Sequence, residues 1–280
     1  EAIARIVTAG GIDENDVVQI SFGYGLFTGG FGLHYGIEKV GATIVPMSSG
    51  NTQKQLMLMQ DFGTTALVAT PSYAMYLSEM IKEKGIPRDN FKLKYGFFGS
   101  EAMSEKMREK LEDSMGILVT SNYGLTEVMG PGVSGECIYK CGEHINEDMF
   151  IVEIIDPKTG EVLPYGESGE VVITTLTKEA MPVLRYRTRD ISYIIPEPCT
   201  CGRTSYRLAP IQGRTDDMLK IKGVNLFPSE IESVVLEFPQ VSPNYQLILR
   251  RENMLDTLEI VVELVDGSLL ERFSEIEKLE

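Results

Sequence analysis

Side chains that could do chemistry gather in residues 121–130, where the sequence reads SNYGLTEVMG. Tyr123 supplies an aromatic ring, Gly124 a turn without a side chain, Thr126 a hydroxyl and Glu127 a carboxylate. A carboxylate is a ligand that Mg²⁺ prefers, and an aromatic ring beside it can form one side of a binding site. Taken alone the pattern is short, and an ordinary turn at the end of a strand explains it better.

The four cysteines of the chain and one of its two histidines fall into two short segments. Thiolates and imidazole are ligands of Zn²⁺, which structural sites hold in a closed tetrahedral arrangement. The predicted zinc ligands are Cys137, His144, Cys199 and Cys201, and Cys141 is the competing ligand. Reduced thiols without a metal are the alternative. A disulfide suits a cytoplasmic setting less well.

Other polar side chains near these motifs are interpreted as structural. His34 lies on a helical pattern among aromatic residues, so we expect a packed or capping side chain. A solvated acidic loop is expected for the acids beside the cysteines, which are Glu136, Glu143, Glu147 and Asp148.

The first 130 residues alternate between strand-like and helical patterns. Apolar runs typical of strands occupy residues 16–22, 42–47, 65–70, 92–99 and 117–124, and helical patterns lie around residues 31–40, 53–62, 72–84 and 105–114. Thr70 and Ser104 are predicted N-caps, and Gly116 a helix stop. Strands separated by single helices predict a parallel sheet covered on both faces, with ligands at the carboxyl ends of the strands.

The rest of the chain has a different pattern. Residues 149–195 are typical of β-hairpins, with DPKTG as a turn, and from residue 216 strands surround one helix before a last helical pattern. We therefore predict an α/β chain with a mostly parallel sheet flanked by helices. The expected units are an α/β core at 1–148, a β-rich subdomain at 149–214 and a small, truncated α+β domain at 215–280.

The chain of 280 residues carries 26 Lys and Arg against 41 Asp and Glu, a net charge of −15. This acidity argues against binding to nucleic acid or to anionic membranes, which are themselves negative. No apolar run is long enough to span a bilayer, and no secretion signal is visible. We expect a cytoplasmic protein without membrane or nucleic-acid partners, and a homodimer is left open.

Residues 121–130 form a set with three further motifs, which follow one another along the chain. These are FFGSE at 97–101, before residues 121–130, and YRTRD at 186–190 and GRTDDMLKIKG at 213–223, after them. Together they resemble the adenylate-forming superfamily of acyl-CoA synthetases, luciferases and peptide-synthetase adenylation domains. The phenylacetate–coenzyme A ligase branch is the closer match. That match covers essentially the whole chain and is carried by residues 22–50, 143–157, 174–190 and 213–232.

The resemblance implies an ATP-dependent reaction in two steps. A carboxylic acid, here an aryl-acetic acid such as phenylacetate, becomes an acyl-adenylate with release of pyrophosphate, and the acyl group then passes to coenzyme A. Glu127 would coordinate Mg²⁺, Thr126 would contact the α-phosphate, and Tyr123 would stack on adenine. The other implied nucleotide-binding residues are Ser100 and Glu101 along the ring, Gly124, Asp190 at the ribose hydroxyls and Arg214 at the ribose or phosphate.

The resemblance also implies an acyl pocket and a moving C-terminal domain. Rings alternate with glycines around the expected pocket, which suits a flat apolar acid; its residues are Tyr24, Phe27, Phe98 and Gly99. Core packing of Phe27 and Phe98 is the open alternative. Asp216 matches the hinge of the C-terminal domain, and Lys222 with Gly223 would approach the acyl site during thioester formation.

Two parts of the family pattern are missing. The phosphate loop expected before residue 22 has no counterpart in residues 1–20, and the catalytic lysine would follow residue 280. We expect the chain to be a piece of a longer polypeptide. Two other functions stay open: adenylyl transfer to another acceptor such as a deazaflavin cofactor, and a nucleotide- or acyl-binding module without turnover.

Overall fold

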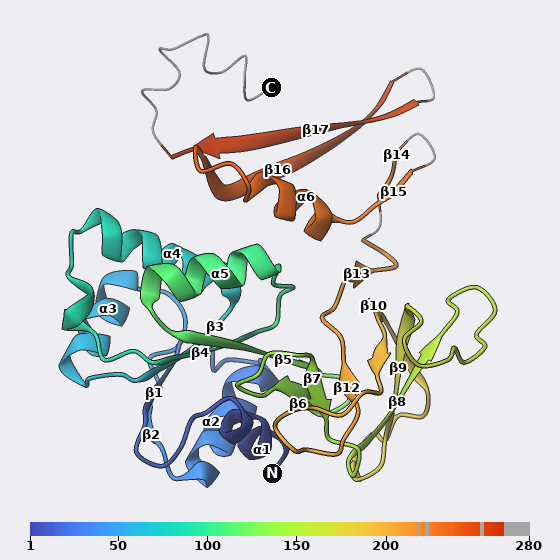
Figure 1. Cartoon of the computed structure of the whole chain (residues 1–280), viewed down its shortest axis with the longest axis horizontal. Helices are drawn as coiled ribbons and strands as arrows, with labels where there is room; N and C mark the ends of the chain where they lie inside the picture. The colour runs from blue at the N-terminus through green and yellow to red at the C-terminus, as the bar shows by residue number, and fades with distance from the viewer. Residues whose placement is uncertain (218, 222–223, 253–254, 266–280) are drawn as a thin grey trace.

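A computed structural model describes residues 1–217, 219–221, 224–252 and 255–265 (Figure 1). Lys222, Gly223 and the last predicted helical pattern lie outside the described residues. Within the described part of the chain, no helix is long and apolar enough to cross a membrane.

The first 125 residues build the parallel half of a nine-stranded sheet, as predicted. The strands lie in the order β2-β1-β3-β4-β5 and all their pairings are parallel. They are β1 (Val17–Ile20), β2 (Thr43–Val45), β3 (Ala66–Ala69), β4 (Tyr95–Gly99) and β5 (Leu118–Leu125).

Helices cover both faces of this sheet (Figure 1). One face packs against α1 (Ala2–Ala9) and α2 (Thr28–Val40). The other packs against α3 (Thr52–Asp61), α4 (Pro71–Glu83) and α5 (Glu105–Met115), and a short 3₁₀ helix (Arg88–Asn90) precedes β4.

The predicted helix boundaries are confirmed by local hydrogen bonds. Thr70 Oγ1 accepts from the Tyr73 N–H at 3.2 Å, and Ser104 Oγ accepts from the Met107 N–H at 3.2 Å. Each side chain thereby satisfies a backbone donor that the first helical turn leaves free. Gly116 ends α5 at φ 64°, in the left-handed region that favours glycine.

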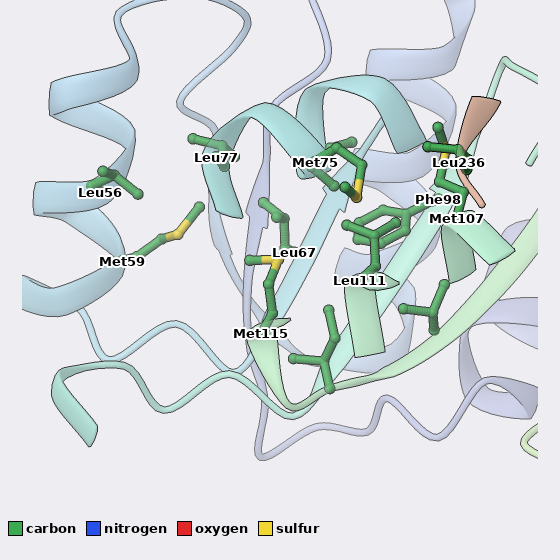
Figure 2. Close-up of a cluster of buried hydrophobic side chains, with 14 residues drawn as sticks. Leu56, Met59, Leu67, Met75, Leu77, Phe98, Met107, Leu111, Met115 and Leu236 are labelled. Carbon is green, nitrogen blue, oxygen red and sulfur yellow. The ribbon is translucent and has the colours of Figure 1, made fainter. Parts of the chain in front are cut away.

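Figure 2 shows the apolar core under α3, α4 and α5. Phe98 on β4 and Leu111 on α5 are both completely buried there. The Phe98 ring lies over Gly96, where an added Cβ would come within 2.5 Å of it. Leu236, which follows the helix of the C-terminal unit, is buried in the same cluster.

An antiparallel half extends the sheet beyond β5, and the sequence analysis did not predict it. Its strands are β6 (Gly130–Glu136), β7 (Glu143–Ile145), β12 (Arg207–Leu208) and β11 (Ile194–Ile195), in that order. The last two come from the region expected in the β-rich subdomain. The chain therefore leaves this sheet after β7 and returns to it near residue 194.

Between those two points the chain forms a separate antiparallel sheet in the order β13-β10-β9-β8. Its strands are β8 (Phe150–Ile155), β9 (Gly169–Thr175), β10 (Tyr186–Ser192) and β13 (Gly213–Arg214). The predicted hairpin is present, but its returning strand begins only at Gly169, well beyond the DPKTG turn.

Where the structure describes it, the C-terminal unit combines two small antiparallel sheets with one helix. It contains β14 (Leu219–Ile221), β15 (Val224–Leu226), α6 (Pro228–Val235), β16 (Val241–Glu252) and β17 (Leu255–Leu264). It contacts the core through α5, where Lys106 Nζ lies 2.5 Å from Glu237 Oε1.

Candidate functional site

A crevice of about 460 Å³ lies at the carboxyl ends of β4 and β5. Residues 98–103 and 121–125 form its walls on the first sheet. Asp190 and Arg214 come from the second sheet, and Pro228 and Ser229 from the C-terminal unit. The crevice thus brings together most of the predicted nucleotide-binding residues: Ser100, Glu101, Tyr123, Gly124, Asp190 and Arg214.

Tyr123 and Asp190 join the two sheets inside this crevice. The Tyr123 hydroxyl donates to Asp190 Oδ2 at 2.5 Å. Burial raises the pKa of Asp190 above its usual value, although the hydrogen bond from Tyr123 and the charge of Arg214 oppose this. Burial and the Asp190 carboxylate together raise the pKa of Tyr123, so the phenol keeps its proton.

Arg214 bridges Asp190 to the predicted hinge residue. Its Nη1 donates to Asp190 Oδ1 at 3.3 Å, and its Nε donates to Asp216 Oδ1 at 2.9 Å. Arg189 Nη1 donates to Asp216 Oδ2 at 3.2 Å. The hydrogen bond from Arg214 holds the pKa of Asp216 below its usual range. Both carboxylates are therefore tied to one guanidinium group.

The opposite wall of the crevice is made where β4 ends. Ser100 has φ 69°, a left-handed conformation that is uncommon for residues other than glycine. Glu101 Oε2 accepts from the Ser72 N–H at 3.2 Å, at the start of α4. At Gly99 an added Cβ would lie 2.8 Å from the Asn122 carbonyl oxygen, so a side chain there would push β4 and β5 apart.

Thr126 and Glu127 follow the crevice wall directly but are not among the residues that line it. Thr126 Oγ1 lies 2.9 Å from Thr28 Oγ1 at the start of α2. Lys178 Nζ donates to the Glu127 carbonyl at 2.6 Å. Burial raises the pKa of Tyr186 on β10, and the Glu127 carboxylate raises it further.

Two of the predicted acyl-pocket rings lie on the loop between β1 and α2. The Tyr24 hydroxyl lies 3.1 Å from His34 Nδ1, which fits the expected packed histidine, and its ring meets Phe31 edge-on at 5.4 Å. Phe27 packs on Phe22 at 5.8 Å. Neither Tyr24 nor Phe27 is among the residues that line the crevice, and Thr28 after this loop contacts Thr126.

Phe98 differs from this pair because its ring belongs to the core. It borders the crevice but is completely buried among leucines and methionines. Phe98 therefore packs in the core and also borders the crevice, and its role in the acyl pocket stays a prediction.

The predicted metal ligands converge on one point. One ligand atom from each of Cys137, His144, Cys199 and Cys201 lies within 4.8 Å of all the others. Cys137 Sγ is 3.7 Å from Cys199 Sγ, and Cys201 Sγ is 3.3 Å from His144 Nε2. Cys141 Sγ lies 3.4 Å from Cys199 Sγ but is not in this group of four.

The chemistry of the donors suits a cation. Burial and two nearby arginines lower the pKa of His144 to about 4, so its imidazole is neutral at pH 7 and able to bind a metal. Its Nδ1 lies 3.2 Å from Ser205 Oγ, which orients Nε2 toward the sulfur atoms. Burial opposes ionisation of Cys199, but hydrogen bonds from Cys201 and the other thiols bring its pKa down to about 7. Burial raises the pKa of the Cys137 thiol to about 12.

A second hollow, of about 820 Å³, lies beside this cysteine–histidine cluster. It is lined by α1, by residues 144–148 and by residues 202–205. Of the predicted site residues that the structure describes, it includes His144 alone.

The expectation of a solvated acidic loop is wrong for Glu136 and Glu143. Their exposed fractions are 1% and 6%, whereas Glu147 and Asp148 are exposed. Glu136 is paired with Arg108 at 2.6 Å, and burial and Glu136 raise the pKa of Glu143 to about 7. A signal was present in the sequence, since each acid directly precedes a predicted ligand and neighbouring strand residues point to opposite faces.

Comparisons with known proteins agree with this geometry. The family model described as AMP-binding enzyme matches residues 4–177, and the one described as AMP-binding enzyme C-terminal domain matches residues 223–280. A phenylacetate-coenzyme A ligase of Thermus thermophilus is 48% identical over 264 residues, which cover 94% of this chain and 59% of that protein.

Among solved structures, 2-hydroxyisobutyryl-CoA ligase in the postadenylation state, in complex with R3-HIB-AMP, has a TM-score of 0.92 at 27% identity. The match covers 99% of this chain and 60% of that one. The same enzyme in the thioesterification state, in complex with 2-HIB-AMP and CoA, has a TM-score of 0.73 at the same coverage and identity.

Proposed function

The chain belongs to the AMP-binding enzyme family, and we propose that it forms the larger part of an ATP-dependent, AMP-forming acid–thiol ligase. The proposed substrate is an aryl-acetic acid of the phenylacetate class, and the acyl acceptor is coenzyme A. Support for the substrate comes from the name of the Thermus relative, and support for the acceptor also from the CoA complex of the solved ligase. The chain spans 59% of that relative, so the complete reaction is proposed rather than shown.

The observation that carries the proposal is the contact between Tyr123 and Asp190 inside the crevice. An ionised carboxylate offers about four acceptor positions. Tyr123 uses one on Oδ2 and Arg214 one on Oδ1. The carboxylate therefore keeps acceptor capacity for further donors, such as the hydroxyls of a ribose. We propose that Asp190 binds the ribose and that the Tyr123 ring stacks on adenine.

The remaining roles follow from the same placement. Ser100, Glu101 and Gly124 would border the adenine, and Thr126 would donate its hydroxyl to the α-phosphate. Arg214 would support the ribose side through its contacts with Asp190 and Asp216. The hinge role of Asp216 and the role of Lys222 rest on the family resemblance, since Lys222 lies outside the described residues.

Glu127 is the proposed Mg²⁺ ligand. Mg²⁺ is usually bound by one or two carboxylates together with substrate phosphates and waters. The donor set fits, because Glu127 is an exposed acid directly after the crevice wall and pairs with no Lys or Arg side chain among the described residues. When bound, Mg²⁺ would neutralise charge on the phosphates.

In the proposed reaction, a carboxylate oxygen of the acid attacks the α-phosphorus of ATP and the bond to pyrophosphate breaks. The sulfur of coenzyme A then attacks the acyl carbonyl carbon, and the bond to AMP breaks. The residues of this chain hold the nucleotide between two sheets, while Pro228 and Ser229 of the C-terminal unit border the crevice from a third side. Fixing both reactants in this way removes much of the entropic barrier.

The acyl group would lie toward the loop that carries Tyr24 and Phe27. Thr28 follows this loop and lies 2.9 Å from Thr126, beside the proposed α-phosphate position. Gly99 would let β4 and β5 stay closely paired beside the crevice. Aromatic rings at this place favour a flat apolar acid through edge-to-face contacts.

We also propose a structural Zn²⁺ held by Cys137, His144, Cys199 and Cys201. Three thiols and one neutral imidazole are a donor set that suits zinc. Reduced thiols are kept in the cytoplasm, which is the location we propose. A homodimer stays a prediction.

The test is exchange of labelled pyrophosphate into ATP by the complete polypeptide, with phenylacetate compared against benzoate, hexanoate and 2-hydroxyisobutyrate. Phenylacetate should support the fastest exchange, and coenzyme A should convert the adenylate to phenylacetyl-CoA. Asp190→Asn should suppress the exchange, whereas Asp113→Asn on the exposed face of α5 should not. Absence of acid-dependent exchange in the wild type would show that the ligase proposal is wrong.

A further inference from the structure

Three charged residues alternate with the cysteines and histidine of residues 136–144, from the end of β6 into β7. Glu136 directly precedes Cys137, Lys140 precedes Cys141, and Glu143 precedes His144. The sulfur and imidazole atoms gather in the cysteine–histidine cluster. The charged side chains reach the opposite way, toward α5 and β5.

Two of these side chains hold one residue of β5. The Ser121 N–H donates to Glu136 Oε2 at 2.8 Å, and the Ser121 hydroxyl donates to Glu143 Oε1 at 2.7 Å. Glu143 Oε2 accepts in turn from Ser134 Oγ at 2.8 Å. Ser134 on β6 is the register partner of Tyr123 on β5. Glu143 therefore contacts both strands at the point where the proposed adenine-binding ring is attached.

The third side chain reaches the same strand through α5. Lys140 Nζ lies 2.8 Å from both carboxylate oxygens of Glu112. Glu112 Oε1 also accepts from the Val119 N–H at 2.9 Å. These hydrogen bonds thus hold strand β5 at two positions, Val119 and Ser121, which are separated by one residue.

Stability alone does not account for so many buried charges. Glu136 pairs with Arg108, and both side chains are at most 4% exposed. A buried ion pair of this kind stabilises little compared with apolar residues of the same size, and fixing one register is its best-attested role. Arg108, Ser121 and Glu143 all border the crevice, so the register that they fix is that of the crevice wall.

We propose that Glu136 and Glu143 are positioning residues, which hold β5 against β6 and β7 so that Tyr123 keeps its place opposite Asp190. Neither carboxylate needs to touch the nucleotide. The inference rests on the proposed nucleotide site and adds to it two residues that act through Ser121.

The test measures AMP affinity by isothermal titration calorimetry, on the protein as purified without chelators. Glu143→Gln replaces one of the two carboxylate oxygens that accept from Ser121 and Ser134 with an amide donor, and it should weaken AMP binding up to about tenfold, the effect of losing one buried hydrogen bond. Ser121→Ala should give a similar loss, and it takes the place of Glu143→Gln if that variant does not fold. The matched control is Asp148→Asn, an exposed acid of the same segment, which should leave AMP affinity unchanged.

A double variant separates positioning from a general loss of structure. In a Tyr123→Leu background there is no ring to hold, so Glu143→Gln should cause little further loss of AMP affinity. The positioning role would be overturned if Glu143→Gln lowered AMP affinity equally in the wild type and in Tyr123→Leu, or in neither. If the wild type binds no AMP, the proposed function fails and takes this inference with it; if it binds AMP and Glu143→Gln has no effect, only the inference fails.

Discussion

The Tyr123 hydroxyl lies 2.5 Å from Asp190 Oδ2, although 67 residues separate the two and they belong to different sheets. This contact fixes the width of the crevice between the first sheet and β10. A nucleotide that uses both residues would therefore bind a preformed site, with little rearrangement to reduce its affinity.

The first prediction concerns the phenol itself. Tyr123→Phe keeps the ring but removes the donor to Asp190, so that carboxylate loses one of its partners. We expect AMP affinity to fall by about tenfold, because hydrogen bonds to charged groups contribute about 1.5–3 kcal/mol. Titration calorimetry measures it, and Tyr139→Phe, an exposed tyrosine, is the control. An unchanged affinity would mean that the contact does not shape the site.

The second prediction concerns pH. Asp190 must be ionised to accept hydrogen bonds from ribose hydroxyls, and its pKa lies above the usual aspartate value of 3.8. AMP affinity should therefore fall as the pH decreases through that raised pKa. Arg214→Met removes a cation that favours the ionised form of Asp190, so the pKa of Asp190 should rise further. As the pH is lowered, AMP affinity should then begin to fall at a higher pH than in the wild type.

The measurement for this prediction is the AMP dissociation constant as a function of pH for both proteins. Arg185→Met, which removes an arginine paired with Glu153 on the same sheet, is the control. If AMP affinity falls with the same midpoint pH in Arg214→Met as in the wild type, or with a lower one, Asp190 is not the ribose-binding carboxylate.

The third prediction concerns the metal. Native mass spectrometry of protein purified without chelators should show one zinc per chain. A metal present at a hundred times its dissociation constant stabilises the folded state by about 2.7 kcal/mol, so a chelator should lower Tm by about 5 °C or more. Cys199→Ser should lose the metal, whereas Cys141→Ser, outside the group of four, should keep it. Metal-free protein from an unchelated preparation would refute the zinc site.

The fourth prediction concerns the docking of the C-terminal unit. Leu236 is 3% exposed and packs in the core cluster of α4 and α5. Leu236→Ala should weaken this docked arrangement by about 2 kcal/mol, the lower end of the cost of a buried leucine. Small-angle scattering should show a more extended protein, and proteases should cut more readily around residues 214–217. Lys106→Met, which removes only the exposed ion pair with Glu237, should change either readout far less.

The sequence predicted elements well where local chemistry defines them. Thr70 and Ser104 start their helices because their side chains accept from free backbone N–H groups, and this needs only neighbouring residues. Pro71 suits the first helical position because the N–H that it lacks has no partner there. The α/β pattern also follows from local periodicity. The fold class could therefore be predicted from the order of strand and helix patterns.

The antiparallel half of the sheet could not be predicted in the same way. Strand β6 reads GPGVSGE, which lacks the alternation of a typical strand and has Val133 as its single β-branched residue. It forms because α1 packs closely on it: at Gly135 an added Cβ would lie 2.6 Å from Ile6 Cβ. Its pairing with β5 and β7 and the tertiary contact with α1 define this strand, and none of these is visible in the local pattern.

The site shows the same division. The family motifs correctly placed Tyr123 and Asp190 in one crevice, and residue types alone pointed to the four atoms of the cysteine–histidine cluster. The buried positions of Glu136 and Glu143 were missed, because an acid in a loop is usually solvated and only the partners Arg108 and Ser121 make its burial tolerable.

The return of the chain to the first sheet near residue 194 bears on how the protein is made. Cys137 and Cys199 are 62 positions apart, and β7 pairs with β12, which is synthesised much later. A nascent polypeptide leaves the ribosome from its N-terminus, at about 5–20 residues per second. The edge of β7 and the first two proposed metal donors thus lack their partners for several seconds of synthesis, a period in which a chaperone that shields exposed strands would be of most use.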